Sequence, residues 1–218
     1  MNRTFIVADD HPLFRGALRE ILASLPGEHV IVEAADFDQA AAAVSAHPEA
    51  DLLLLDLAMP GAIGFAGLAL MRAEHPGVPI AIVSGSEDAP LIRRALDLGA
   101  SGYIPKSASF DEIRAAISSL LAGDVYLPAH VQLGAEGDPE IAALIERMRS
   151  LTPQQTRVLT MLGKGLLNKQ IAYELGISEA TIKAHVSAVL QKLGVDSRTQ
   201  AVIRLGQLDP GRDESVIR

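Results

Sequence analysis

The sequence predicts an α/β fold with a doubly wound, five-stranded parallel sheet, followed by a small all-α domain. Over roughly the first 120 residues, short apolar runs alternate with segments of helical periodicity, which is typical of a parallel sheet covered on both faces. From Leu151 onward there are only short helical segments. The length of 218 residues suits one large or two small domains, at roughly 100–200 residues each.

The first part of the chain contains five runs rich in Val, Ile and Leu that we expect to be strands. They are Thr4–Ala8, Val30–Ala34, Asp51–Leu55, Pro79–Val83 and Gly102–Ile104. The helices expected between and after them are Pro12–Leu25, Phe37–Ala46, Gly64–Glu74, Pro90–Leu98 and Ser109–Leu121. Five such βα units in about 120 residues match the flavodoxin-like doubly wound fold.

The rest of the chain divides by composition. Gly134, Gly137 and Pro139 indicate the end of the first domain, so we place an α/β domain at 1–122 and a linker at 123–150 with a short helix over Ile141–Met148. An all-α domain follows at 151–208 and a tail at 209–218. The expected helices of this all-α domain are Pro153–Leu162, Lys169–Leu175, Glu179–Leu193 and Ser197–Leu208.

Composition excludes several classes of protein. Hydrophobic residues make up 49% and charged residues 21%, which excludes wholesale disorder. The absence of cysteine excludes disulfides, thiol nucleophiles, thiolate zinc sites and Fe–S clusters. The N-terminal apolar stretch is too short for a signal peptide, and the longest uncharged run, Leu57–Met71, is too short for a bilayer span of about 20 residues. We therefore expect a cytoplasmic protein with no membrane partner.

The net charge of −8 is unevenly distributed. Residues 1–150 contain 10 basic and 21 acidic residues, whereas residues 151–218 contain 9 basic and 6 acidic ones. The acidic total argues against nucleic-acid binding for the whole chain. The second part is nevertheless a candidate for contact with a phosphate backbone.

Polar side chains follow the expected strands at the edge where sites form in an open parallel sheet. Strand 1 is followed by Asp9 and Asp10, strand 3 by Asp56, strand 4 by Ser84 and strand 5 by Lys106. A single Asp, Ser or Lys at a strand end is usually an N-cap or a solvated residue. The coincidence of all five favours a common site instead.

These residue types indicate phosphoryl-group chemistry. Crowded carboxylates repel one another unless a cation holds them, and oxygen ligands favour Mg²⁺. A divalent ion with a lysine and a hydroxyl can stabilise a transferring phosphoryl group, and a carboxylate can accept it as an acyl phosphate. Asp56 is the expected nucleophile, with Lys106 and Ser84 contacting the phosphoryl oxygens.

The α-helical segment has the spacing of a helix-turn-helix, with a turn at Gly176-Ile177-Ser178. The second helix has an apolar stripe, and its opposite face has small and polar residues that can reach base edges in a major groove. The stripe is Ile182, Val186, Val189, Leu190 and Leu193, and the opposite face is Ala180, Lys183, Ala184, Ser187 and Gln191. Residues 151–208 contain 7 basic and 3 acidic residues, a surplus that a solvated helical domain without DNA could also have.

The expected strand ends of the first domain carry the motifs Ala8-Asp9-Asp10-His11-Pro12, Asp56-Leu57-Ala58-Met59-Pro60-Gly61, Ser84-Gly85 and Gly102-Tyr103-Ile104-Pro105-Lys106. With these motifs the domain resembles the receiver domain of bacterial two-component response regulators. This resemblance implies that Asp56 accepts phosphate from a sensor histidine kinase. It also implies that Asp10, Asp56 and the carbonyl of Ala58 bind Mg²⁺, with Asp9 acting mainly through water, and that Ser84 moves toward the phosphoryl group and lets Tyr103 turn inward.

The helices of the second domain carry the motifs Leu151-Thr152-Pro153, Asn168-Lys169-Gln170-Ile171-Ala172, Leu175-Gly176-Ile177-Ser178, Thr181-Ile182-Lys183-Ala184-His185-Val186, Lys192-Leu193-Gly194-Val195 and Arg198-Thr199-Gln200-Ala201. With these motifs the domain resembles the LuxR-type DNA-binding domain. Joined to a receiver, this is similar to the NarL/FixJ class. The residues that the resemblance places against DNA are Asn168, Lys169, Thr181, Lys183, Ala184, His185 and Ser187. Those that it assigns to dimerisation are Val195, Ala201 and Val202.

The sequence departs from the family pattern at a few positions. Ser84 stands where Thr is frequent, which keeps the hydroxyl but removes a methyl group. Gln155 stands where Glu is usual, so a buried charge pair between helices is absent. Ser187 occupies a groove-facing position that is basic in some members. Pro105 lacks an N–H and is tolerated best on an edge strand.

We therefore expect a phosphorylation-dependent DNA-binding transcriptional regulator, forming a homodimer on double-stranded DNA when phosphorylated. Two alternatives remain open. A Mg²⁺ phosphohydrolase of the haloacid dehalogenase type would have Asp two residues after the nucleophile, where this chain has Ala58; steady turnover of phosphoesters would indicate it. An interaction module that has lost DNA binding would show no salt-dependent gel shift. His11 and His185 are expected to form hydrogen bonds or to face phosphate rather than bind metal.

Overall fold

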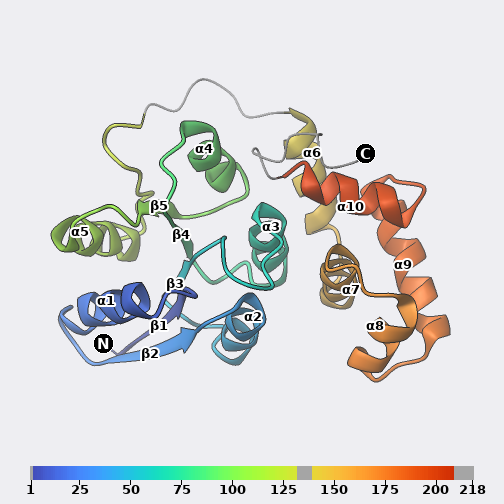
Figure 1. Ribbon diagram of the computed structural model, residues 1–218, viewed down its shortest axis with the longest axis horizontal. Coiled ribbons are helices and arrows are strands. Elements are labelled where there is room, and N and C mark those ends of the chain that lie inside the picture. Colours follow the sequence, from blue (N-terminus) through green and yellow to red (C-terminus); the bar gives the residue numbers. More distant parts are fainter. Residues whose placement is uncertain (1, 132–138, 209–218) are drawn as a thin grey trace.

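The computed structural model describes residues 2–131 and 139–208 (Figure 1). The predicted C-terminal tail at 209–218, and part of the predicted linker, lie outside the described residues. The strands are β1 (Arg3–Ala8), β2 (His29–Ala34), β3 (Leu52–Leu55), β4 (Ile80–Ser84) and β5 (Gly102–Pro105). The helices are α1 (Pro12–Ala23), α2 (Phe37–Ala46), α3 (Phe65–Glu74), α4 (Ala89–Asp97), α5 (Phe110–Leu121), α6 (Pro139–Arg149), α7 (Pro153–Gly163), α8 (Asn168–Leu175), α9 (Glu179–Leu193) and α10 (Arg198–Gly206).

The five strands form one parallel sheet in the order β2-β1-β3-β4-β5. Helices α1 and α5 cover one face, and α2, α3 and α4 cover the other (Figure 1). Alternate residues of β1 enter the two separate cores, since Phe5 and Val7 pack with α1 and α5, whereas Ile6 and Ala8 pack on the opposite face. The predicted doubly wound five-stranded fold is confirmed.

Most predicted boundaries agree with the structure to within two residues. Asp51, expected to begin the third strand, lies just before β3, where its carboxylate accepts a hydrogen bond of 2.8 Å from the Thr4 backbone N–H. A polar side chain at this strand end is therefore used to satisfy a backbone donor. The linker helix predicted over Ile141–Met148 is α6.

The outer edge of β5 is covered by the chain that follows α5. The Tyr103 N–H donates to the Tyr126 carbonyl at 3.0 Å, and the Tyr126 N–H donates to the Ser101 carbonyl. A Cβ atom at Gly102 would lie 2.9 Å from the Tyr126 carbonyl oxygen, so glycine allows this close approach. Pro105 lies on this edge strand, as the sequence predicts.

The C-terminal domain is built from well-capped helices. Thr152 caps α7 with Pro153 at its first turn, and Ser178 caps α9 by accepting a hydrogen bond of 3.1 Å from the Thr181 N–H. Gly176, between α8 and α9, has a φ of +64°, a left-handed conformation that glycine adopts without strain. The predicted helix-turn-helix is thus present.

Gln155 links the helices of this domain although it is uncharged. Its side-chain oxygen accepts a hydrogen bond of 2.8 Å from Lys192 Nζ on α9 and one of 3.0 Å from the Thr152 backbone N–H. Lys192 Nζ also donates to the Ser150 carbonyl at 2.7 Å. A bond from a charged donor to the amide oxygen therefore connects α7 to α9 in place of a charge pair. None of the helices among residues 2–131 and 139–208 has the length and apolar character needed to span a bilayer.

Candidate functional site

The carboxyl ends of β1, β3 and β5 bring Asp9, Asp56 and Lys106 into direct contact. Lys106 Nζ lies 2.7 Å from Asp9 Oδ2 and 2.8 Å from Asp56 Oδ2. Both aspartate side chains are almost fully buried, at 1% and 3% exposure. The ammonium group therefore compensates two carboxylates that have been removed from water.

Asp56 is held in a defined orientation by both of its oxygens. Its Oδ1 accepts a hydrogen bond of 2.8 Å from the Ala58 backbone N–H, and its Oδ2 accepts one from Lys106. Its own N–H donates to the Ala8 carbonyl at 2.9 Å, which continues the pairing of β3 with β1. The four leucines of β3 place Asp56 at the end of a fully buried strand.

Lys106 is positioned by β5 and by an aromatic ring. Its N–H donates to the Ser84 carbonyl at 2.7 Å, and its Nζ lies 5.2 Å from the centre of the Phe14 ring. Burial works against the charge of the ammonium, but its hydrogen bond to Asp56 and its charge interactions with Asp56 and Asp9 outweigh this and raise the pKa of Lys106 above its ordinary value. The group therefore stays charged at neutral pH.

Asp9, Asp10, His11 and Asp56 form a cluster of potential metal ligands whose ligand atoms lie within 4.8 Å of one another. Asp9 Oδ2 and Asp10 Oδ1 are buried and form no hydrogen bond with the described residues. Their close contacts are with the Lys106 ammonium for Asp9 and with His11 Nδ1, at 2.7 Å, for Asp10. Buried carboxylate oxygens without hydrogen-bond donors fit a hard cation such as Mg²⁺.

Ser84 and Tyr103 are connected through the backbone of Ser86. Ser84 Oγ accepts a hydrogen bond of 3.2 Å from the Ser86 N–H, and Tyr103 Oη donates one of 2.8 Å to the Ser86 carbonyl. Tyr103 is 1% exposed, so its ring lies inside the domain. Burial, more than its neighbours, raises the pKa of the Tyr103 hydroxyl, which keeps its proton. A movement of Ser84 would therefore be transmitted to the segment that leads into α4.

Several supporting residues were not predicted from the sequence. Arg15 donates a hydrogen bond of 2.6 Å to the Asp9 carbonyl and pairs with Glu33 at 2.9 Å, which ties α1 to β1 and β2. Phe14 and Ser86 likewise support groups at the site. In the sequence, His11 stands directly between Asp10 and Pro12. This adjacency to Asp10 was the available signal that His11 lies beside the carboxylates.

The predicted DNA-contacting residues lie on α8 and α9. Lys169, Thr181, Lys183, Ala184 and Ser187 are exposed, and Asn168 and His185 are half-buried. Of the predicted apolar stripe of α9, Ile182, Val189 and Leu193 are buried, and Val186 and Leu190 are half-buried. Helix α9 thus presents a small and polar face to solvent, as a helix that enters a major groove requires.

The residues predicted for dimerisation differ in exposure. Val195 and Ala201 are buried inside the domain, at 9% and 0% exposure, whereas Val202 on α10 is 38% exposed. The neighbouring Ile203 is 41% exposed. In the described chain, therefore, the apolar surface that α10 offers comes from Val202 and Ile203.

Both halves of the chain match known families. Residues 5–118 match the response regulator receiver domain. The chain belongs to the response regulator family. Residues 149–205 of this response regulator match the luxR family of bacterial regulatory proteins. A receiver joined to a LuxR-type domain makes it a DNA-binding regulator of transcription in a two-component system, of the NarL/FixJ class, rather than a classical enzyme.

Its relatives share this organisation over nearly their whole length. The response regulator is 42% identical over 211 residues to a glycerol metabolism activator of Pseudomonas putida, covering 94% of this chain and 95% of the relative. It is 34% identical over 206 residues to the nitrate/nitrite response regulator protein NarP of Escherichia coli, covering 91% and 92%. A crystal structure of a LuxR-family two-component response regulator from Aurantimonas sp. aligns with a TM-score of 0.53 and 28% identity, covering 69% of this chain and all of that one.

Proposed function

We propose that phosphorylation of Asp56 controls DNA binding by the C-terminal domain. The observation that carries this proposal is the arrangement around Asp56, a buried carboxylate with one oxygen on the Lys106 ammonium and the other on the Ala58 N–H. The donor is a sensor histidine kinase. A carboxylate oxygen of Asp56 attacks the phosphorus of phosphohistidine, the P–N bond breaks, and a P–O bond to Asp56 forms.

Mg²⁺ would be held by Asp10, Asp56 and the Ala58 carbonyl, with Asp9 acting mainly through water. When bound, it neutralises negative charge on the phosphoryl oxygens. Lys106 supplies a second positive charge to these oxygens. Ser84, whose oxygen accepts a hydrogen bond from the Ser86 N–H in the structure, donates its hydroxyl proton in a hydrogen bond to the phosphoryl group.

In the C-terminal domain, the proposed contacts with DNA come from α8 and α9. They involve the residues named above: Asn168, Lys169, Thr181, Lys183, Ala184, His185 and Ser187. Val202 contributes directly to a homodimer, and Val195 and Ala201 support it from inside the domain. The proposed domain limits are 1–122 for the receiver, 123–150 for the linker and 151–208 for the DNA-binding domain.

The Asp56→Asn variant tests the site. Acetyl phosphate with Mg²⁺ is expected to add one phosphoryl group to the wild-type chain, with acetate leaving, and to add none to the variant, because an amide oxygen is a poor nucleophile. Mass spectrometry of the intact protein measures the product. Unchanged circular dichroism of the variant is the control for folding. Full labelling of Asp56→Asn would show that another residue is the acceptor.

A further inference from the structure

His11 places a ring nitrogen among the carboxylates at the end of β1. Its Nδ1 lies 2.7 Å from Asp10 Oδ1 and 3.3 Å from Asp9 Oδ1. With an oxygen of Asp56, the ligand atoms of this cluster all lie within 4.8 Å of one another. Ligand atoms on opposite sides of a small divalent ion, each about 2.1 Å from it, are about 4.2 Å apart. The cluster therefore needs only a small contraction to surround one ion.

The His11 nitrogen and the Asp10 oxygen are close without being hydrogen-bonded. Asp10 Oδ1 is buried and has no hydrogen-bond partner among the described residues, although His11 Nδ1 lies 2.7 Å away. The same Nδ1 lies 3.5 Å from Lys106 Nζ, and because a lysine ammonium can only donate, this contact uses the lone pair of the nitrogen. A nitrogen lone pair and an unpartnered carboxylate oxygen thus lie side by side, as two ligands of one metal ion do.

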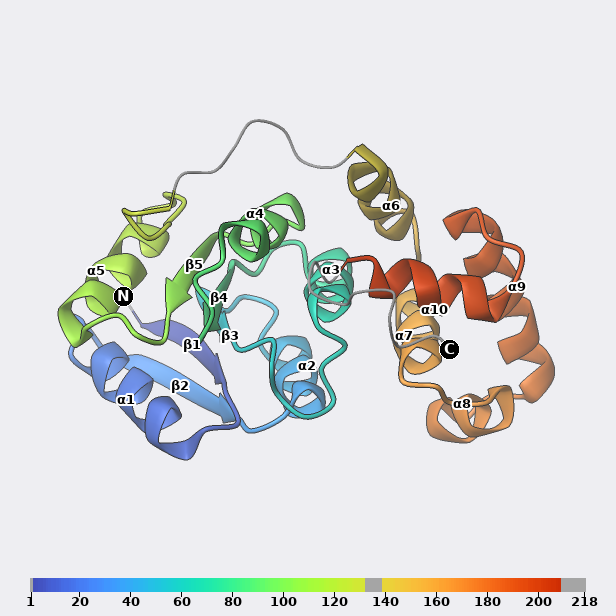
Figure 2. The same cartoon turned by 45° about the horizontal axis from the view of Figure 1, so that its top comes forward.

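The position of His11 is set by its backbone and not by its ring. The His11 N–H donates a hydrogen bond of 2.8 Å to Asp9 Oδ1, and the side chain makes no capping bond to α1, which begins at the next residue. The side chain is 66% exposed, so the imidazole lies at the solvent-facing rim of the site. Helix α1 lies away from the C-terminal helices (Figures 1 and 2). The ring can therefore approach or leave an ion without disturbing α1.

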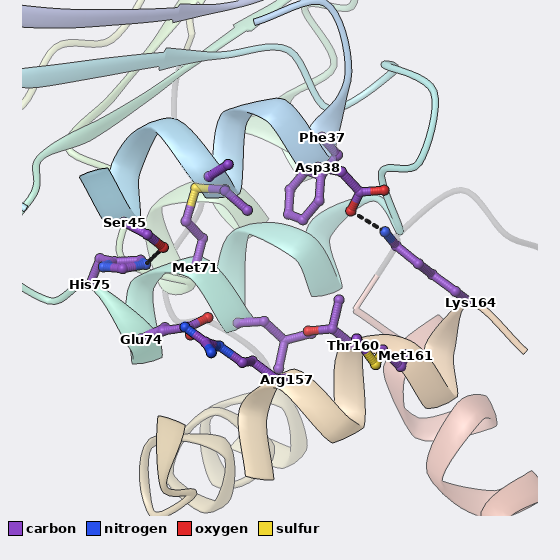
Figure 3. Close-up of a pocket in the computed structure, with 13 residues that line it drawn as sticks. Phe37, Asp38, Ser45, Met71, Glu74, His75, Arg157, Thr160, Met161 and Lys164 are labelled. Atoms are coloured by element: carbon purple, nitrogen blue, oxygen red, sulfur yellow. Dashed lines mark hydrogen bonds and ion pairs between the residues drawn. The ribbon is translucent and has the colours of Figure 1, made fainter. Parts of the chain in front are cut away.

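Other histidines of the described chain lack such a set of neighbours. His130 pairs with a single carboxylate, that of Glu87, at 2.8 Å. His75 lies beside a pocket of about 210 Å³ between α2, α3 and α7, where its Nε2 is 3.4 Å from the Ser45 hydroxyl (Figure 3). Within the part of the chain that the structure describes, the cluster at His11 is the one group of three or more metal-ligating side chains.

An imidazole changes which ions a carboxylate cluster favours. Mg²⁺ is bound through carboxylate, carbonyl and water oxygens, whereas imidazole nitrogen is a preferred ligand of Fe²⁺, Ni²⁺, Cu²⁺ and Zn²⁺. A cluster with one nitrogen and several carboxylate oxygens therefore suits these ions. Without the nitrogen, the remaining ligands are oxygens, which suit Mg²⁺.

We propose that His11 is a ligand for a first-row transition-metal ion at the carboxylate cluster, and that it gives this site a preference for such ions over Mg²⁺. Nδ1 binds the transition-metal ion together with Asp10 and Asp56, whereas the exposed ring turns to solvent when the carboxylates hold Mg²⁺. This role differs from the hydrogen bond or phosphate contact expected for His11 from the sequence. The inference rests on the metal site of the proposed function but not on phosphoryl transfer.

The His11→Gln variant tests this assignment. Ni²⁺ and Mg²⁺ are each titrated into the metal-free full chain by isothermal titration calorimetry. We expect the Ni²⁺ affinity to fall about tenfold or more, because a ligand is lost. The Mg²⁺ affinity should stay the same or rise, because glutamine removes the nitrogen and supplies an amide oxygen. Retained Mg²⁺ binding also shows that the variant is folded.

Two further variants locate the ion. His130→Gln is the matched control, because the His130 side chain is 63% exposed, similar to that of His11, and faces a single carboxylate. It should leave both affinities unchanged. Asp10→Asn should weaken the binding of both ions, which places Ni²⁺ at the carboxylate cluster.

The outcomes separate a ligand from a positioning residue. Equal weakening of Ni²⁺ and Mg²⁺ binding by His11→Gln would contradict the proposal, since His11 would then position Asp10 and not bind the ion. An unchanged Ni²⁺ affinity in His11→Gln, or Ni²⁺ binding that survives Asp10→Asn, would overturn it as well. If the wild-type chain binds Ni²⁺ through His11 but binds no Mg²⁺, the Mg²⁺ site of the proposed function is wrong and the assignment of His11 stands.

Discussion

Replacing Lys106 by methionine should lower the free energy of unfolding by about 3 kcal/mol. The ammonium group lies within 2.8 Å of both Asp9 and Asp56, whose side chains are almost fully buried. Its removal leaves two neighbouring carboxylates without their cation, and breaking a buried ion pair by deleting one partner is strongly destabilising. Methionine keeps the length of the side chain, so the loss reports the charge more than the packing.

Urea denaturation followed by circular dichroism measures this effect. Lys183→Met is the matched control, because Lys183 is exposed and pairs with Glu179 at 3.1 Å on the surface of the same helix. This control should change the free energy of unfolding by less than about 0.5 kcal/mol. Millimolar Mg²⁺ should recover part of the stability lost in Lys106→Met, since a bound cation can replace the missing charge. Equal effects of the two substitutions would show that Lys106 does not compensate the buried carboxylates.

The double variant Lys169→Gln/Lys183→Gln should weaken DNA binding about tenfold or more. The negative slope of log affinity against log salt should become less steep by about 2. Both side chains are exposed, Lys169 on α8 and Lys183 on the small and polar face of α9. Each proposed phosphate contact releases counterions when it forms, so its removal reduces the salt dependence as well as the affinity.

Fluorescence anisotropy with genomic fragments over a range of salt concentrations measures the slope. Arg204→Gln is the control, because it removes one positive charge from α10, on another part of the same domain, where Arg204 faces Glu140 at 3.7 Å. The control should leave the slope nearly unchanged. If the wild-type chain phosphorylated at Asp56 shows no salt-dependent binding at all, the DNA-contact assignments are wrong.

The main features of the receiver could be predicted from the sequence because they depend on strand ends. In a parallel sheet, the residue after each strand reaches the same edge, so Asp9, Asp56 and Lys106 had to converge once their strands were identified. The supporting contacts of Arg15 and Phe14 were not predictable in this way. They depend on how side chains of α1 lie against the sheet, which spacing alone does not determine.

The hydrogen bond between α7 and α9 is a second feature that could not be predicted from the sequence, for a different reason. The sequence indicates that a charge is absent at Gln155, so no charge pair between the helices is expected there. The amide oxygen nevertheless accepts the Lys192 hydrogen bond, because that contact requires an acceptor and not a full negative charge. The packing of α7 beside α3, with Arg157 3.1 Å from Glu74, was also not predictable from the sequence, since it joins surfaces that are distant in the chain.

The central claim is that a phosphoryl group on Asp56 changes DNA binding. The most direct measurement is the affinity for genomic DNA fragments, by anisotropy, of the same preparation before and after treatment with acetyl phosphate and Mg²⁺, in parallel with Asp56→Asn. We predict that the affinity of the wild-type chain changes at least about fivefold, within the usual range of coupling between sites, and that the affinity of the variant stays constant. An equal change in both proteins, or no change in wild-type chains phosphorylated at Asp56, would contradict this account.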